Sequence, residues 1–278
     1  MRVRAAFLAA LALGLLYMSD ACAATKPLHW IINGPALQYY IQDASARAYF
    51  EGAQPFVIRR KTDTLTLPPS WNAREVRSFT SERAIERAFA TGAIDSHVRA
   101  ILYDNEAWSF TPLEEQRDSA GYTRKAASVV HAHGLQLIAA PSVNLLRTLD
   151  PGYTGKKFQR FLELGVLGGA AKSADVVVIQ AQGAETALPL YSGFVRDGAG
   201  QARAANPHVL VLAGVSTNPS GQAVTADQVL AAIEQTKGAV DGYWMNVPSP
   251  GAYCPGCTEF RPDMAIQVLK KLSQGRLP

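Results

Sequence analysis

Eight short apolar runs alternate along the chain with segments of helical pattern, and this alternation limits the possible folds more than any other feature. The runs cover residues 28–34, 55–60, 74–79, 98–106, 135–141, 175–182, 208–215 and 242–247. Several of them, such as "DVVVIQ", are continuously apolar, which is typical of strands buried on both faces of a parallel sheet. Eight strand–helix units in about 250 residues match the size of a (β/α)8 barrel. We therefore predict an α/β protein built as a single (β/α)8 TIM-type barrel.

The second and third units are the least regular part of this pattern. The segment "KTDTLTLPPSWN" is a long, proline-bearing connection in which no helix is evident. A doubly wound open sheet is the alternative architecture, but it would carry a glycine-rich phosphate loop after the first strand, where the chain has "INGPALQ". The barrel is thus expected to be irregular in its second and third units.

Two helix starts can be read from the sequence. In "TPLE" we expect Thr111 to cap a helix, with Pro112 in its first turn and Glu114 as the reciprocal partner. "TADQ" repeats the device, with Thr225 as the cap and Gln228 as its partner.

The N-terminal residues have the features of an export signal. "MRVR" is basic, the following run "AAFLAALALGLLYM" is apolar, and "ACAA" offers small residues for cleavage after Ala23 or Ala24. The run is shorter than the about 20 residues of a membrane span. We predict a signal peptide over residues 1–24 and a barrel domain over 25–278, secreted or periplasmic and without stable membrane insertion. A lipoprotein acylated at Cys22 is the alternative.

The charge, the cysteines and the absence of certain motifs in the sequence limit the ligands and partners that we expect. The chain has 27 Lys and Arg against 23 Asp and Glu, a net charge of +4, and no long basic run, so nucleic acid is not an expected partner. Cys254 and Cys257 are expected to form a local disulfide in an oxidising compartment, in preference to a redox pair or a zinc site. No metal-ligand spacing or cofactor phosphate motif is found, so we expect neither metal nor cofactor. The oligomeric state stays open.

The fourth apolar run ends in "AILYDNEAW", residues 100–108, which places two carboxylates two residues apart. Side chains alternate along a strand, so Asp104 and Glu106 should share one face while Tyr103 and Asn105 point the other way. In a barrel the first face is the interior, and active sites of this fold lie at the carboxyl ends of the strands. The pair is therefore predicted to lie at the mouth, with the Cα atoms about 6 to 7 Å apart.

Two neighbouring, partly buried acids cannot both ionise cheaply, so one keeps a proton near neutral pH. A retained proton is what a glycosidic oxygen needs when it leaves. We predict Glu106 as general acid and Asp104 as the carboxylate that orients it and tunes its pKa. The alternative is structural, with both acids bound to an arginine that holds the loops.

Other polar and aromatic residues at the expected mouth are candidates for substrate binding. Trp108 and Trp244 offer flat surfaces for sugar rings, while amide side chains at strand ends can hydrogen-bond hydroxyl groups. The amide candidates are Asn33, Asn144, Gln180, Gln182 and Asn246. A second carboxylate would come about 5 to 9.5 Å from the first. Glu185, shortly after the sixth run, is the first candidate, and Asp241 precedes the eighth.

With these residues in place, the chain resembles the chitinase-like glycoside hydrolases of family 18. Those enzymes end their fourth strand in DxxDxDxE, with the final glutamate as acid, and carry an aromatic residue on the eighth strand, where this chain has Trp244. The resemblance implies the same barrel fold and an acid role for Glu106. Arg99 and Leu102 stand in place of the family's other two aspartates. In the sixth run "IQAQ" replaces the methionine-x-tyrosine pattern.

The sequence therefore predicts a secreted, glycoside hydrolase-like enzyme that acts on an oligo- or polysaccharide. The rival prediction is a catalytically inactive barrel that binds glycans at the cell surface or in the periplasm.

Overall fold

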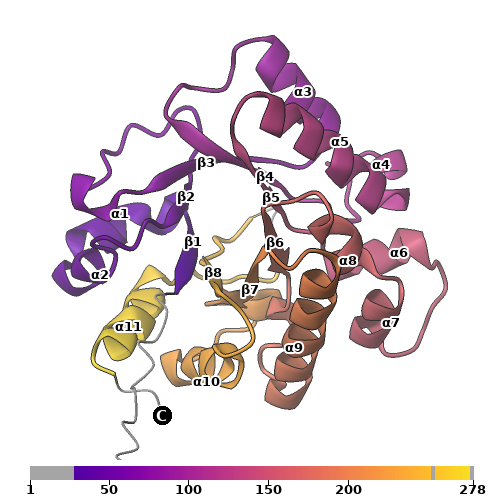
Figure 1. Ribbon diagram of the computed structural model, residues 1–278. Coiled ribbons are helices and arrows are strands. Elements are labelled where there is room, and N and C mark those ends of the chain that lie inside the picture. The colour runs from indigo at the N-terminus through magenta and orange to yellow at the C-terminus, as the bar shows by residue number, and fades with distance from the viewer. Residues whose placement is uncertain (1–27, 252–253, 276–278) are drawn as a thin grey trace, which may run out of the picture.

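The computed structural model describes residues 28–251 and 254–275 as a closed barrel of eight parallel strands, in the order β1 to β8 (Figure 1). The predicted single (β/α)8 barrel is thus confirmed, and each predicted run coincides with one strand, although β7 extends one residue beyond its run. The signal-peptide prediction for residues 1–24, including Cys22, lies outside the described residues. The strands are β1 His29–Asn33, β2 Phe56–Ile58, β3 Arg74–Phe79, β4 Val98–Tyr103, β5 Gln136–Ala139, β6 Val176–Ile179, β7 Leu210–Ser216 and β8 Gly242–Asn246.

Helices surround the ring of strands (Figure 1). The α-helices are α1 Gly34–Gln42, α2 Ala44–Tyr49, α3 Glu82–Ala90, α4 Leu113–Arg117, α5 Ser119–Ala132, α6 Leu146–Leu149, α7 Lys157–Glu163, α8 Val166–Ala171, α9 Leu188–Ala205, α10 Ala226–Thr236 and α11 Pro262–Ser273. Short 3₁₀ turns are η1 Pro69–Trp71, η2 Val143–Leu145, η3 Gln182–Ala184 and η4 Pro219–Gly221. Within the described residues, no helix is both long and apolar enough to cross a membrane.

The irregularity expected in the second and third units is found mainly in the second. The connection from β2 to β3 contains only the turn η1 and no α-helix. The third unit has an ordinary helix, α3, but the pairing of β3 with β4 shifts register between Glu75 and Val76.

The apolar residues form two cores separated by the strands. Strand residues that point inward fill the barrel, among them Ile31, Leu102 and Trp244. The alternate strand residues, such as Tyr103, point outward and pack against the helices in a larger outer core. Because the strands are covered on both faces, most of them are nearly continuously apolar; β3, with Arg74, Glu75 and Arg77, is an exception.

One predicted helix cap is confirmed and the other is wrong. Thr225 and Gln228 form the reciprocal capping box of α10. Thr111 does not cap α4, whose first residue is Leu113 and whose cap position is Pro112. The Thr111 hydroxyl instead donates a hydrogen bond to the carbonyl oxygen of Thr80, 2.7 Å away, because the loop after β4 folds back onto the end of β3.

The predicted disulfide between Cys254 and Cys257 is present. It closes a short loop between β8 and α11.

Two aspartates link neighbouring strands through hydrogen bonds at the amino-terminal end of the barrel, opposite the mouth. Asp175, just before β6, accepts hydrogen bonds from the backbone N–H of Leu137 in β5 (2.7 Å) and pairs with His131 at the end of α5 (2.8 Å). Asp241, just before β8, repeats the arrangement with Val211 of β7 (2.9 Å) and Arg203 of α9 (3.0 Å). Each carboxylate thus joins two strands and one helix.

We expect Asp175→Ala to lower the free energy of unfolding by about 1 to 3 kcal/mol, because it leaves the N–H of the fully buried Leu137 without an acceptor. Denaturant unfolding followed by circular dichroism measures this. The matched control is Asp197→Ala on the exposed side of α9, which should change stability by less than about 0.5 kcal/mol. Equal effects of the two substitutions would contradict the role given to Asp175.

Candidate active site

The end of β4 positions both carboxylates as predicted, although the strand itself is shorter than expected. β4 ends at Tyr103, so Asp104 and Glu106 lie in the segment directly after it. Extended backbone pairing nevertheless continues, since the N–H of Asp104 donates to Phe79 of β3 (2.8 Å) and the carbonyl of Asn105 accepts from Ser142 (3.0 Å). The inward–outward alternation of the strand therefore persists through this segment.

Outward-facing partners hold the alternation in place. The Tyr103 hydroxyl donates to Oε2 of the buried Glu115 in α4, at 2.7 Å. The amide of Asn105 donates to the Tyr103 hydroxyl (2.9 Å) and to the carbonyl oxygen of Glu115 (3.0 Å). Glu115 Oε2 also accepts the backbone N–H of Glu82 at the start of α3, 2.7 Å away. Because residues 103 and 105 are fixed on the helix side, residues 104 and 106 must face the barrel.

On the inner side, amide groups bind the two carboxyls. Gln180, at the end of β6, donates from Nε2 to Asp104 Oδ1 (2.8 Å) and to the carbonyl oxygen of Ala140 (2.7 Å). Asn144 donates from Nδ2 to Glu106 Oε2 at 2.8 Å, and its own Oδ1 accepts the N–H of Ala107. These partners are neutral amides rather than an arginine, which differs from the structural alternative of a salt-bridged pair.

The protonation of the pair follows from burial. Desolvation, and secondly the charge of Glu106, raise the pKa of Asp104 well above its ordinary value. Desolvation also raises the pKa of Glu106, while hydrogen bonds from Asn144, Asp104 and other neighbours oppose that shift. A hydrogen bond between the carboxyls favours the proton on Asp104. The two groups thus hold at least one proton well above the pH at which an isolated carboxylic acid would lose it.

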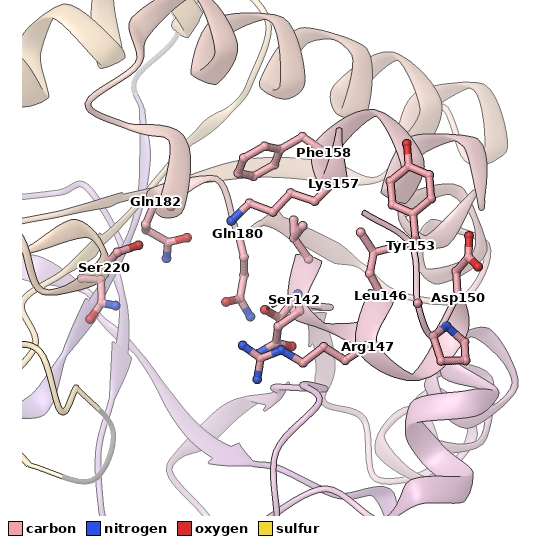
Figure 2. A pocket seen from close by; sticks show the side chains of 16 residues that line it. Ser142, Leu146, Arg147, Asp150, Tyr153, Lys157, Phe158, Gln180, Gln182 and Ser220 are labelled. Carbon is pink, nitrogen blue, oxygen red and sulfur yellow. Dashed lines mark hydrogen bonds between the residues drawn. The ribbon is translucent and has the colours of Figure 1, made fainter. Parts of the chain in front are cut away.

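Two cavities open at the mouth. The first, here called the β5 cavity, has a volume of about 610 Å³ and is bounded by the long connection after β5 (Figure 2). The second, the β1 cavity, also measures about 610 Å³ and lies at the ends of β1, β2 and β8. Asn246 of β8 lines both, so the two cavities adjoin. Asp104 and Glu106 are partly exposed, and the amides that bind them, Gln180 and Asn144, line the β5 cavity.

The predicted amide residues gather at this mouth. Asn144, Gln180, Gln182 and Asn246 line the β5 cavity, and Asn33 lines the β1 cavity. Figure 2 shows Gln180 and Gln182 directed into the same space.

A glycine makes room for one of these amides. The side chain of Gln182 lies over Gly214 of β7, where an added Cβ would meet it at 2.4 Å. A side chain at position 214 would therefore displace Gln182.

The two tryptophans lie in different settings. Trp108 is partly exposed, donates from its indole nitrogen to Thr111 (2.8 Å) and meets the ring of Phe110 edge-on. Trp244 is 9% exposed and belongs to the core inside the barrel. Its Nε1–H is buried and has no hydrogen-bond partner among the described residues. Neither ring lines either cavity, and their role as sugar platforms stays a prediction.

The candidates for a second carboxylate lie away from the cavities. Glu185 is only 2% exposed, and its Oε2 accepts the N–H of Ser216 at 2.7 Å. Asp241 lies at the opposite end of the barrel, bound to Val211 and Arg203. Asp241 is therefore excluded from the mouth, because it precedes its strand rather than following it.

Sequence reasoning did not identify three residues that shape the site. Glu115 lies in a helix whose pattern gives no sign that its carboxylate is buried. Arg147 and Lys157 line the β5 cavity from the connection after β5, where the sequence shows no recognisable motif. The unusual length of that connection is the one signal that could have drawn attention to them.

No cluster of three or more His, Cys, Asp or Glu side chains suited to a metal occurs in the described part of the chain. The polar groups of the mouth are mainly amides, which suit hydrogen bonding to hydroxyl groups.

The fold and site define a closed (β/α)8 barrel with a carboxyl pair and several amides at its mouth. No protein-family model matches the chain, and no curated protein matches it in sequence. Among solved structures, a chitinase from Chromobacterium violaceum is 13% identical, with a TM-score of 0.46, covering 89% of this chain and 99% of its own. A putative alpha-L-fucosidase from Bacteroides thetaiotaomicron is 9% identical, with a TM-score of 0.49, covering 98% and 99%.

A sugar phosphate isomerase/epimerase from Parabacteroides distasonis is 10% identical, with a TM-score of 0.46, covering 90% and 95%. These three proteins differ in the type of reaction that their names give, and the likeness extends to the fold alone. The functional conclusion rests on the residues of the mouth.

Glu185 should make stability fall as the pH rises. Burial raises its pKa from 4.5 to about 8 in the folded protein, so the folded state binds more protons than the unfolded state between these values. The free energy of unfolding then decreases from about pH 4.5 to about pH 8, by roughly 1 to 4 kcal/mol for this group. Glu185→Gln, which mimics the protonated acid, should flatten that decrease.

Denaturant unfolding of the parent and the variant at pH 5, 6, 7 and 8 measures the difference. Glu51→Gln, at an exposed position, is the control and should follow the parent. Parallel curves for the parent and Glu185→Gln would show that this carboxyl does not titrate in that range.

Proposed function

We propose that the protein is an exported glycoside hydrolase in which Glu106 is the general acid and Asp104 its supporting carboxyl. The observation that carries the proposal is the pair itself: two acids on the inner face at the end of β4, bound by amides of a cavity at the mouth. Their shared proton is retained above the pH at which an isolated carboxylic acid would lose it, because burial disfavours the doubly ionised state.

The contacts of the pair suit proton transfer to a leaving oxygen. Glu106 lies two residues further along the chain than Asp104, towards the mouth, and it is partly exposed. Asp104 passes the shared proton to Glu106 as Glu106 delivers it to the glycosidic oxygen, and the pair takes a proton back from the water that replaces the leaving group. Gln180 then stabilises the charge left on Asp104, because its amide already donates to that carboxyl.

The acceptor of the glycosyl group is either water or a group of the sugar. Of the carboxylates that line the cavities, Asp150 pairs with Arg160 (2.6 Å) and Asp63 accepts the N–H of Arg60 (2.8 Å). Neither is placed beside the pair by any contact of the structure. A carboxylate nucleophile is therefore no part of the proposal.

The predicted rival function, glycan binding without turnover, is favoured by one specific observation. Amides and hydroxyls are prominent among the side chains that line the β5 cavity, whereas neither carboxyl of the pair is part of its lining. Hydrolysis requires a substrate to approach Glu106 past Asn144, whereas binding alone does not.

We expect Glu106→Gln to lower the rate of hydrolysis by about 10² to 10⁴, because the amide has no proton to donate. The rate of hydrolysis is measured as the release of reducing ends from a panel of bacterial and plant polysaccharides, with the parent and the variant side by side. Glu51→Gln serves as the control for a loss of negative charge and should keep the parent rate. If the parent cleaves no polysaccharide, or if Glu106→Gln is as active as the parent, Glu106 is not the acid.

Asp104→Asn should move the alkaline limb of the pH–rate profile to lower pH. In the parent, the last proton of the pair leaves only when two adjacent negative charges form, so it is retained to higher pH. In the variant Glu106 loses its proton without that repulsion. The rate profile between pH 4 and 9 measures the shift, and an unmoved limb would rule out electrostatic coupling between the two groups.

A further inference from the structure

We propose that the β5 cavity binds an anionic group of the carbohydrate, a carboxylate or a sulfate ester, through Arg147 and Lys157. The inference rests on the proposed function for the nature of the ligand, and it adds the charge of the substrate. Neither residue belongs to the carboxyl pair or to the amides that bind it.

The charge of the cavity wall carries the inference. Arg147 and Lys157 both line the cavity. Asp150 is the one acidic residue of the lining, and the guanidinium of Arg160 neutralises it at 2.6 Å. The remaining polar lining residues carry uncharged amide and hydroxyl groups: Ser142, Asn144, Tyr153, Gln180, Gln182, Ser220 and Asn246.

Both cations belong to exposed residues, and both line the cavity. Figure 2 shows the ends of Arg147 and Lys157 pointing toward Gln180 from two sides of the cavity. In the described part of the chain neither of them forms an ion pair, in contrast to Arg160 on the same wall. The Lys157 ammonium lies over the ring of Phe158, 5.0 Å from its centroid.

The chemistry of the two groups fits an oxyanion. A guanidinium presents parallel N–H donors that match a carboxylate or a sulfate, and an ammonium adds a compact second charge. The surrounding amides supply further donors for hydroxyl groups of the same sugar. A bound anion would also add negative charge on the side of Glu106, which favours the protonated form that the proposed acid needs.

The test is direct binding, measured by isothermal titration calorimetry at low ionic strength. The probes are two pairs, each an anionic oligosaccharide and its uncharged form: oligogalacturonate with its fully methyl-esterified form, and kappa-carrageenan oligosaccharides, whose only charges are sulfate esters, with their desulfated form. We expect the acidic member of at least one pair to bind about tenfold more tightly than its neutral partner. The pair that responds tells a carboxylate ligand from a sulfate ligand.

Variants locate the site. Arg147→Ala and Lys157→Ala should each weaken binding of that acidic probe about tenfold and leave the neutral partner unchanged. Lys156→Ala removes an equal charge from the adjacent, exposed position that does not line the cavity, and it should stay within about twofold of the parent. Arg147→Lys keeps the charge and should recover part of the loss.

The inference is overturned if neither acidic probe binds more tightly than its neutral partner, or if Lys156→Ala weakens binding as much as Lys157→Ala. The same titrations with Glu106→Gln separate this inference from the proposed hydrolysis. Charge-dependent binding by a protein that cleaves nothing would refute only the hydrolytic function. Cleavage restricted to neutral glycans would refute only the anion site.

Discussion

Two carboxyl groups side by side on the inner face of a barrel are the constraint from which the chemistry of this mouth follows. Burial and mutual repulsion prevent Asp104 and Glu106 from ionising together, so the pair keeps a proton that separate surface acids would lose. The protein stabilises this arrangement with neutral donors. A lysine or arginine beside the pair would have ionised both groups and removed the acid.

The pair is held from both sides of the strand. Tyr103 and Asn105 bind Glu115 on the helix side, while Gln180 and Asn144 bind the carboxyls on the barrel side. Gln180 also bonds the backbone of the residue after β5, so one amide connects three neighbouring strand ends. Small movements of these strands would therefore change the distance between the two acids.

Local patterns were enough to predict the strands, because a parallel barrel requires apolar residues on both faces of each strand. The inward orientation of Asp104 and Glu106 followed from the two-residue repeat alone. The amides at the ends of β5 and β6 were also predictable, since parallel strands bring their carboxyl ends together. The burial of Glu115 was not, because it depends on how α4 folds against β4. Arg147 and Lys157 were missed for a related reason. Both line a cavity formed by an irregular connection, and a connection without a helical or strand repeat gives no pattern from which the positions of its side chains could be predicted.

The clamps formed by Asp175 and Asp241 lie at the end of the barrel remote from the mouth. Strand alignment is thereby secured by groups that line neither cavity of the mouth. The connection after β5 can consequently be replaced or lengthened without disturbing the register of the strands. The aspartates at the amino-terminal end keep the strands aligned while the new connection forms a different side of the cavity. A scaffold organised in this way lends itself to changing what the cavity accepts without rebuilding the barrel.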